Sequence, residues 1–343
     1  MIEATWELVI VIIGIALVFD FTNGFHDSAN SISTVVSTKV LSPRNAVIFA
    51  AFFNFIAAFG FGVAVASTVS KIIQLDVVPT GLIPYIILGA LIGAISWNLI
   101  TWFFGLPTSS SHALIGGLAG AGISAAGFAA IKWSTVEIVV AFMILSPLIG
   151  LVCGFLFMAA VLWLTRKANK KTAENHFKNL QLVSAAANCF SHGTNDAQKT
   201  IGIIIPLLFA VGYYGASADP NNLPIPFEVI ILAYTAIALG TLSGGWRIVK
   251  TMGYNIIKMR PVHGFAANAA SASTILGASI MGIPVSTTHI ICSSIMGVGT
   301  TRGASAVKWG VARTIMWAWI LTIPISALIG FAAFAVIRVV IGY

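Results

Sequence analysis

The feature that most constrains this chain is a run of 55 residues, Val77 to Ile131, that contains no aspartate, glutamate, lysine or arginine. Four further stretches are also free of these charges, at residues 45–70, 138–165, 261–301 and 314–337. A helix needs about 20 apolar residues to cross a bilayer, so the longest run suffices for two crossings. The stretches show no alternation with period two, which favours helices over the strands of a membrane barrel.

The composition supports a membrane protein and excludes several other classes. Hydrophobic residues make up 58% of the chain and charged residues only 8%, whereas soluble domains carry about 25% charged residues. This excludes an ordinary soluble enzyme and a disordered chain. The net charge of +8 indicates contact with a lipid bilayer and not with nucleic acid. We therefore expect an all-α integral membrane protein with about ten to twelve transmembrane or re-entrant helices.

Basic residues indicate which loops face the cytoplasm. We expect a loop at residues 166–179, which is the most basic of the chain because it contains Arg166, Lys167, Lys170, Lys171 and Lys178. Cytoplasmic loops carry an excess of lysine and arginine. Counting outward from this loop places both termini of a multi-pass membrane protein outside the cytoplasm. The segments that begin at Pro107 and Pro284 can be full spans or re-entrant hairpins. The expected segments are residues 6–38, 45–70, 81–105, 107–128, 137–165, 180–212, 228–246, 261–282, 284–301 and 311–340.

Two motifs occur twice, in the same order. Gly24–Asn30 (GFHDSAN) matches Gly193–Lys199 (GTNDAQK), and Gly105–His112 (GLPTSSSH) matches Gly282–His289 (GIPVSTTH). The offsets of 169 and 177 residues predict an internal duplication. We expect a first repeat at 1–165, the basic cytoplasmic loop at 166–179 and a second repeat at 180–343. An inverted orientation of the second repeat, with interrupted helices, is typical of secondary transporters.

Asp27 and Asp196 occupy equivalent positions in the first pair of motifs, inside apolar segments. A carboxylate in the bilayer costs several kcal/mol unless it is paired, protonated or hydrated. A structural hydrogen bond between helices is one interpretation. Two equivalent aspartates instead favour a site for a coupling cation or proton, with Asp27 and Asp196 as candidate Na⁺ ligands. The oxygen-bearing neighbours that we assign to this site are Asn30, Ser31, Ser33 and Asn195.

The second pair of motifs is typical of helix starts, because proline precedes a run of serine and threonine. Free N–H groups and hydroxyls at a helix N-terminus attract oxyanions, although capping alone would also explain them. The candidate anion-binding residues are Thr108, Ser109, Ser110, Ser111, Ser286, Thr287 and Thr288. His112 and His289 follow these hydroxyls directly, but adjacent helical residues point about 100° apart and form no nucleophile–base pair. We expect His112, His289 and His26 to support the site by hydrogen bonds.

These motifs resemble those of the inorganic phosphate transporter (PiT) family in its short bacterial form. The likeness extends from about Phe19 to Pro324. It implies phosphate uptake by symport with Na⁺ or H⁺, no enzymatic activity, no bound cofactor and a homodimer. Carried over by position, Asp27, Asn30, Asp196 and the hydroxyl clusters would form the phosphate and cation sites. We add Gln198 and Lys199 to the expected phosphate ligands.

Lys199 breaks the symmetry of the repeats, because its counterpart in the first half is Asn30. This difference leaves the coupling ion open between Na⁺ and H⁺, and the cargo open between free phosphate and a metal–phosphate complex. The alternatives are a carrier of another oxyanion such as sulfate, a passive anion channel and a membrane-embedded hydrolase. Sulfate has no proton to donate to a carboxylate, so two aspartates beside the anion favour phosphate.

Overall fold

The computed structural model describes residues 4–60, 62–215, 217–220 and 222–342, and these residues form helices joined by short loops, without a β-strand. Short 3-10 turns occur at Ala57–Phe59, Thr80–Leu82, Phe128–Ala130 and Ala304–Ala306. The α-helices are α1 (Trp6–Ser37), α2 (Pro43–Ile56), α3 (Ala64–Ser70), α4 (Ile83–Phe103), α5 (Ser110–Ala126), α6 (Trp133–Leu164), α7 (Lys170–Ala210), α8 (Phe227–Ser243), α9 (Trp246–Tyr254), α10 (Pro261–Ile280), α11 (Thr287–Thr300) and α12 (Trp309–Val340).

Several of these helices are able to cross a membrane. By length and composition, α1, α6, α12 and the stretch Thr80–Phe103 are long and apolar enough, and two bent helix pairs could each form one further span. Outer surfaces of α6 and α12 remain exposed and carry large apolar side chains, as expected for helices that contact lipid. The predicted all-α membrane fold is thus confirmed.

Two segments that the sequence predicts as single helices are instead broken. The expected segment 45–70 consists of α2 and α3, which lie at 82° to each other. The expected segment 228–246 consists of α8 and the start of α9, which lie at 72°. Gly244 at the second break has a φ of +70°, a backbone conformation that glycine adopts without steric cost. Lys250, which the sequence places in a loop, therefore lies within α9.

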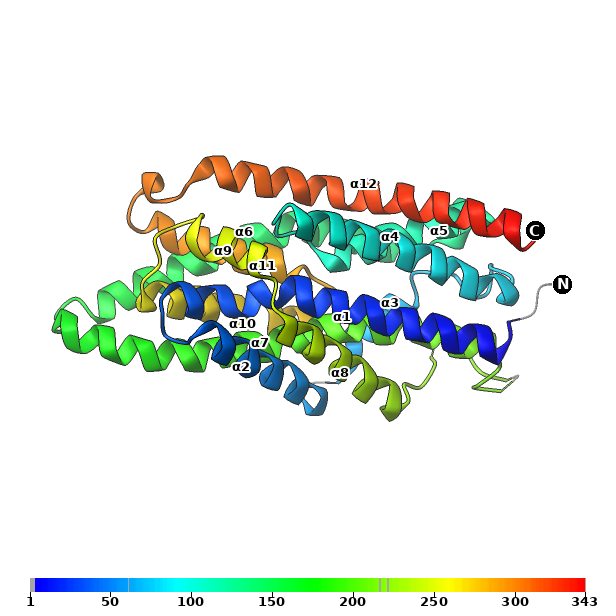
Figure 1. Ribbon diagram of the computed structural model, residues 1–343, viewed down its shortest axis with the longest axis horizontal. Helices are drawn as coiled ribbons and strands as arrows, with labels where there is room; N and C mark the ends of the chain where they lie inside the picture. The colour runs from blue at the N-terminus through cyan, green and yellow to red at the C-terminus, as the bar shows by residue number, and fades with distance from the viewer. Residues whose placement is uncertain (1–3, 61, 216, 221, 343) are drawn as a thin grey trace.

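The segments that begin at Pro107 and Pro284 form short helices. α5 has 17 residues and α11 has 14, fewer than the ~20 needed to cross a bilayer. α5 packs beside α4, and α11 packs beside α10. In Figure 1, the α4–α5 pair lies toward the end of the molecule that holds both termini, whereas α10 and α11 lie toward the other end. Each pair is a helical hairpin, and the two hairpins lie toward opposite ends of the molecule (Figure 1).

α1 and α7 form the centre of the helical bundle. α1 contacts α2, α4, α7, α8 and α9, and α7 contacts α2, α3, α8 and α10. Glycine allows the closest approach: a Cβ atom on Gly24 of α1 would lie 3.0 Å from the Ile237 Cα atom of α8. This tight packing fixes the position of Asp27, which follows Gly24 by three residues on α1.

Candidate functional site

The two hydroxyl-rich motifs begin helices α5 and α11 in the same way. Ser109 is the N-cap of α5, and its side chain accepts a hydrogen bond from the His112 backbone N–H at 3.2 Å. Ser286 is the N-cap of α11 and accepts from the His289 backbone N–H, also at 3.2 Å. The structure thus confirms both predicted helix starts. Each presents an N-terminus whose partial positive charge attracts anions.

The helix starts meet in the interior of the bundle. The Ser111 hydroxyl of α5 donates to the Val285 carbonyl, which precedes α11, at 3.4 Å. The rings of His112 and His289 lie edge to face with their centroids 4.8 Å apart, and His289 also stacks on Trp319 of α12 at 4.0 Å. Neither ring hydrogen-bonds a serine or threonine hydroxyl, so the helix starts contain no serine–histidine pair of the hydrolase type.

Asp27 on α1 is buried beside the start of α11. Its Oδ1 atom lies 2.7 Å from Nδ1 of His26 and accepts a hydrogen bond from the Thr288 hydroxyl at 3.4 Å. Nε2 of His26 lies 3.2 Å from the Thr101 hydroxyl of α4. His26 therefore connects Asp27 to α4, which is the supporting position expected for it. The Asn30 amide donates to the Thr288 hydroxyl at 2.9 Å and joins the same cluster.

Asp196 on α7 is buried and holds an ion pair. Its Oδ1 atom accepts a hydrogen bond from the Lys199 ammonium, three residues further along α7. Its Oδ2 atom accepts from the Thr287 hydroxyl at 3.1 Å and lies 3.2 Å from Nε2 of His192. All four side chains are buried. Asp196 and Lys199 therefore form an ion pair that is shielded from water.

Lys199 connects α7 to both helix starts. Besides Asp196, its ammonium donates to the Ser111 hydroxyl of α5 and to the Val285 carbonyl before α11, the latter at 3.0 Å. The Lys199 side chain is only 1% exposed, so it does not extend to the membrane surface. Its positive charge instead lies at the place where the two helix N-termini meet, which favours an anion there.

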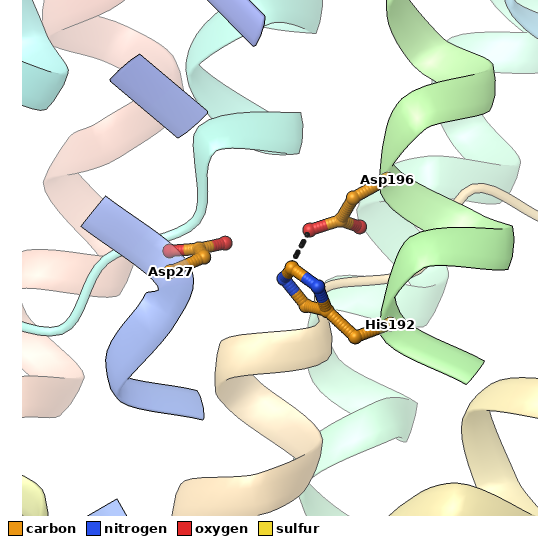
Figure 2. Close-up of side chains that lie close together, drawn as sticks. All are labelled: Asp27, His192 and Asp196. Carbon is orange, nitrogen blue, oxygen red and sulfur yellow. Dashed lines mark ion pairs between the residues drawn. The ribbon is translucent and has the colours of Figure 1, made fainter. Parts of the chain in front are cut away.

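The two copies of the aspartate motif bring their carboxylates to one cluster of buried groups. Figure 2 shows Asp27 on α1 and Asp196 on α7 on either side of the His192 ring. One ligand atom from each of these three residues lies within 4.8 Å of the others. Carboxylate oxygens suit Na⁺ or a proton, and a neutral imidazole nitrogen is also a donor. The donor set therefore fits the expected cation or proton, with Asp27 and Asp196 as its carboxylates.

The hydroxyl motif and the aspartate motif share their contacts. Thr287 contacts Asp196, and Thr288 contacts both Asp27 and Asn30. Thr108 hydrogen-bonds the Thr101 hydroxyl at 2.9 Å and belongs to the His26 side of the cluster. Consequently, an anion bound at the helix starts would lie next to a cation bound at the carboxylates.

Some expected site residues lie elsewhere. Gln198, expected to bind phosphate, has its side-chain oxygen at the start of α3, where it accepts from the backbone N–H of Val65 at 2.9 Å. Its amide nitrogen donates to the Gly62 carbonyl, so the side chain caps a helix. Asn195 donates to the Ser279 hydroxyl of α10 at 2.9 Å. Neither group faces the carboxylates, because successive residues of α7 point in different directions around the helix.

Ser31 and Ser33 are buried on α1, and neither donates a hydrogen bond to Asp27 or Asp196. Several other polar atoms of the residues assigned from the sequence also have no hydrogen-bond partner among the described residues. Buried polar groups are normally paired, so such a concentration is typical of a place that holds a polar ligand or water. The atoms are Asn30 Oδ1, Ser31 Oγ, Ser33 Oγ, Ser110 Oγ, Asn195 Oδ1, His112 Nδ1, His289 Nδ1 and His289 Nε2.

The sequence analysis did not assign three residues that belong to this region. His192 contacts Asp196, and Thr101 contacts His26. Asp20, seven residues before Asp27 on α1, is completely buried. Two of them carried a signal: His192 precedes Asp196 by one helical turn, and Asp20 is an acidic residue within a segment otherwise typical of a membrane span. Thr101 had none, because its role depends on how α4 packs against α1.

Comparison with known proteins agrees with these motifs. Residues 23–330 match the Phosphate transporter family. A Rhizobium meliloti (strain 1021) protein named "Probable low-affinity inorganic phosphate transporter" is 49% identical over 325 residues, which cover 94% of this chain and 95% of that protein. A Bacillus subtilis (strain 168) protein of the same name is 44% identical over 334 residues, covering 97% and 98%.

A solved structure described as "The sodium-dependent phosphate transporter" has the same fold. It superposes with a TM-score of 0.87 at 26% sequence identity, and the match covers 97% of this chain and 99% of that one. The relatives are transporters and not enzymes, and the match extends over nearly the whole chain. This multi-pass membrane protein therefore belongs to the phosphate transporter family.

Proposed function

We propose that this protein imports inorganic phosphate across the plasma membrane by symport with Na⁺ or H⁺. The observation that carries the proposal is the meeting of two capped helix N-termini beside a buried ammonium and two buried carboxylates. The sodium dependence named for the related structure and the names of the bacterial relatives support the same assignment.

Phosphate lies between the starts of α5 and α11. The tetrahedral ion offers four oxygens to opposed donor groups, which here are backbone N–H groups, the Ser110 hydroxyl and the Lys199 ammonium. Ser110 has a buried hydroxyl without a partner, so it is free to donate. The protonated oxygens of phosphate donate in turn to Asp27 or Asp196. Sulfate is fully ionised and would leave these carboxylates facing an anion without a proton between them.

Asp27 and Asp196 hold the coupling ion. Thr287 and Thr288 hydrogen-bond these carboxylates and also belong to the helix start that receives the anion. Binding of a cation lowers the negative charge that the anion meets, so the two solutes favour each other's binding. Such mutual stabilisation is what a symporter requires, because an ion that did not promote phosphate binding could not drive its uptake.

The chain architecture supports alternating access. We infer two repeats, 1–165 and 180–343, joined on the cytoplasmic side by residues 166–179; this segment was expected to be a loop, but residues 170–179 form the start of α7. In each repeat, a long helix is followed by a bent pair, a hairpin and a final long helix. The second repeat is inverted in the membrane, and both termini face away from the cytoplasm. Rocking of one repeat against the other exposes the site to each side in turn.

The protein functions in the bacterial inner membrane, where we expect a homodimer. The exposed apolar surfaces of α6 and α12 support lipid contact. Chemical cross-linking of the purified protein and its mass in lipid nanodiscs test the dimer. A monomer in both measurements would remove this part of the proposal and leave the transport activity unaffected.

Uptake of labelled phosphate into proteoliposomes tests the proposed function. Gradients of Na⁺ and of pH are imposed separately, and sulfate serves as the competing anion. We expect accumulation of phosphate above the external concentration under at least one gradient. A passive channel would only equalise the two concentrations, so the absence of accumulation under both gradients contradicts symport. Adding Mg²⁺ or Ca²⁺ distinguishes free phosphate from a metal–phosphate complex as the cargo.

A further inference from the structure

A second buried acidic position lies on α1, outside the cluster of Asp27 and Asp196. The Asp20 side chain is 0% exposed, and neither of its carboxyl oxygens has a hydrogen-bond partner among the described residues. Asp20 precedes Asp27 by about two turns of α1, on the same side of the helix. α1 begins at the end of the molecule that holds both termini (Figure 1), so Asp20 is nearer to that end than Asp27 along the helix.

Two oxygen-bearing side chains interact with the Asp20 carboxyl group, although no hydrogen bond of normal geometry forms between them. They are those of Asn23 on α1 and Thr200 on α7. Asn23 Oδ1 and Thr200 Oγ1 are themselves buried atoms without a hydrogen-bond partner. A purely structural aspartate would be satisfied by its neighbours, because an unpaired buried polar group is costly. Three adjacent buried groups without a hydrogen bond of normal geometry indicate instead a position whose occupancy changes.

The charged and titratable neighbours of Asp20 come from the helices packed against α1. On α7 these are Asp196 and Lys199, which already neutralise each other. On α8 the Tyr234 side chain lies near Asp20. On α4 the titratable residue is Tyr85, which lies near the start of that helix. Among the described residues around Asp20, the nearby cation, Lys199, is already paired with Asp196, so burial favours the neutral, protonated carboxyl of Asp20.

We propose that Asp20 carries a proton during the transport cycle, so that this protein couples phosphate uptake to H⁺ at a site separate from Asp27 and Asp196. The inference rests on the proposed phosphate symport. The carboxyl O–H donates its proton to a water molecule when the site opens to the cytoplasm. The resulting carboxylate accepts hydrogen bonds from Thr200 and the Asn23 amide, and it takes up a proton again from the extracytoplasmic side.

A proton fits this position better than Na⁺. The surrounding side chains offer only the oxygens of Asp20, Asn23 and Thr200, too few to replace the hydration shell of a metal ion. The nearby Lys199 ammonium adds a repulsive charge. A single carboxyl oxygen suffices for a proton, and the proton removes the charge whose burial is costly.

The number of protons taken up per phosphate tests this proposal in proteoliposomes. A trapped pH indicator and labelled phosphate give the ratio for the wild type, Asp20→Asn and Asp20→Glu at one external pH, where the protonation of phosphate itself is the same in all three. Exchange of labelled for unlabelled phosphate, with equal concentrations on both sides, reports substrate handling that needs no gradient. Glu228→Gln removes an exposed carboxylate from α8 and is the matched control.

We expect Asp20→Asn to exchange phosphate like the wild type, to take up one proton fewer per phosphate and to lose accumulation driven by a pH gradient. Glu228→Gln should match the wild type. An unchanged proton ratio in Asp20→Asn overturns the inference, and so does loss of exchange in a variant that remains folded.

Asp20→Glu covers the case in which the asparagine variant fails to fold. It keeps a titratable group displaced by one methylene, so the pH at which uptake is half-maximal should shift while coupling persists. An unchanged pH profile overturns the inference. Failure of the wild type to accumulate phosphate under any gradient would instead contradict the proposed function, which keeps the two failures distinct.

Discussion

Replacing Lys199 with asparagine would give the second half of the chain the residue that the first half has at Asn30. Lys199 contacts Asp196, Ser111 and the Val285 carbonyl, and its side chain is almost completely buried. Our hypothesis is that its ammonium takes the place of a bound cation beside Asp196. The Lys199→Asn variant should therefore create a cation site that the wild type lacks, and Na⁺ should become a ligand at this position.

The expected size of the effect follows from the contacts of Asp196. Removing one partner of a buried ion pair costs about 3–5 kcal/mol. Asp196 keeps the His192 ring at 3.2 Å and the Thr287 hydroxyl at 3.1 Å, so we expect a loss of about 3 kcal/mol without a cation. At about 2 °C per kcal/mol this lowers the Tm by roughly 6 °C. Na⁺ at 100 times its dissociation constant should then restore about 2.7 kcal/mol.

The assay measures the Tm of purified protein in detergent as NaCl replaces choline chloride at constant ionic strength. Phosphate uptake is measured against Na⁺ in the same series. Lys178→Asn is the matched control, because Lys178 also lies on α7 but is exposed. We expect the rise of the Tm with Na⁺ to be larger in Lys199→Asn than in the wild type and in Lys178→Asn. A lowered Tm that is the same in Na⁺ and choline would refute the idea that the ammonium substitutes for a cation.

Three further predictions concern the central site and the topology. Asp27→Asn and Asp196→Asn should each abolish accumulation of phosphate while membrane expression persists, since removing a charge lowers the cost of insertion; normal accumulation in both would make the carboxylates structural. Ser110→Ala should weaken phosphate binding by roughly 0.5–3 kcal/mol with an unchanged Tm, because its hydroxyl has no protein partner to lose; isothermal titration measures this, and unchanged affinity would place phosphate elsewhere. In a Cys-less background, a cysteine at Asn222 should react with an impermeant thiol reagent from outside, and one at Asn169 only after permeabilisation. The opposite pattern would reverse the orientation.

Much of the fold was predictable because its signals are local. Uncharged runs marked the helices, and proline followed by serine and threonine marked the starts of α5 and α11, which begin three residues after Pro107 and Pro284. The bend between α8 and α9 was not predictable, because Gly244 and Gly245 are equally compatible with a close helix contact. In the folded chain, Gly245 donates to the Ser28 hydroxyl of α1. Only this tertiary contact shows that the helix is interrupted there.

The site was predictable where the two halves repeat each other and unpredictable where they differ. Asp27 and Asp196 stood out because each supported the assignment of the other. Asp20 escaped notice because Cys189 occupies the equivalent position, at the same offset of 169 residues. The direction of the Gln198 side chain was also beyond the sequence, since it depends on where α3 begins next to α7.

The head-to-head arrangement of α5 and α11 has a mechanical consequence. Each helix N-terminus carries about half a positive elementary charge, and the rings of His112 and His289, on the first turns of the two helices, are only 4.8 Å apart. Like charges therefore push the two hairpins apart whenever no anion separates them. A phosphate ion between them is attracted by both helix N-termini, so its binding draws the two halves of the protein together. A neutral solute of the same size would not offset the repulsion between the N-termini of α5 and α11. The charge of the transported ion therefore supplies the attraction that closes the protein around it.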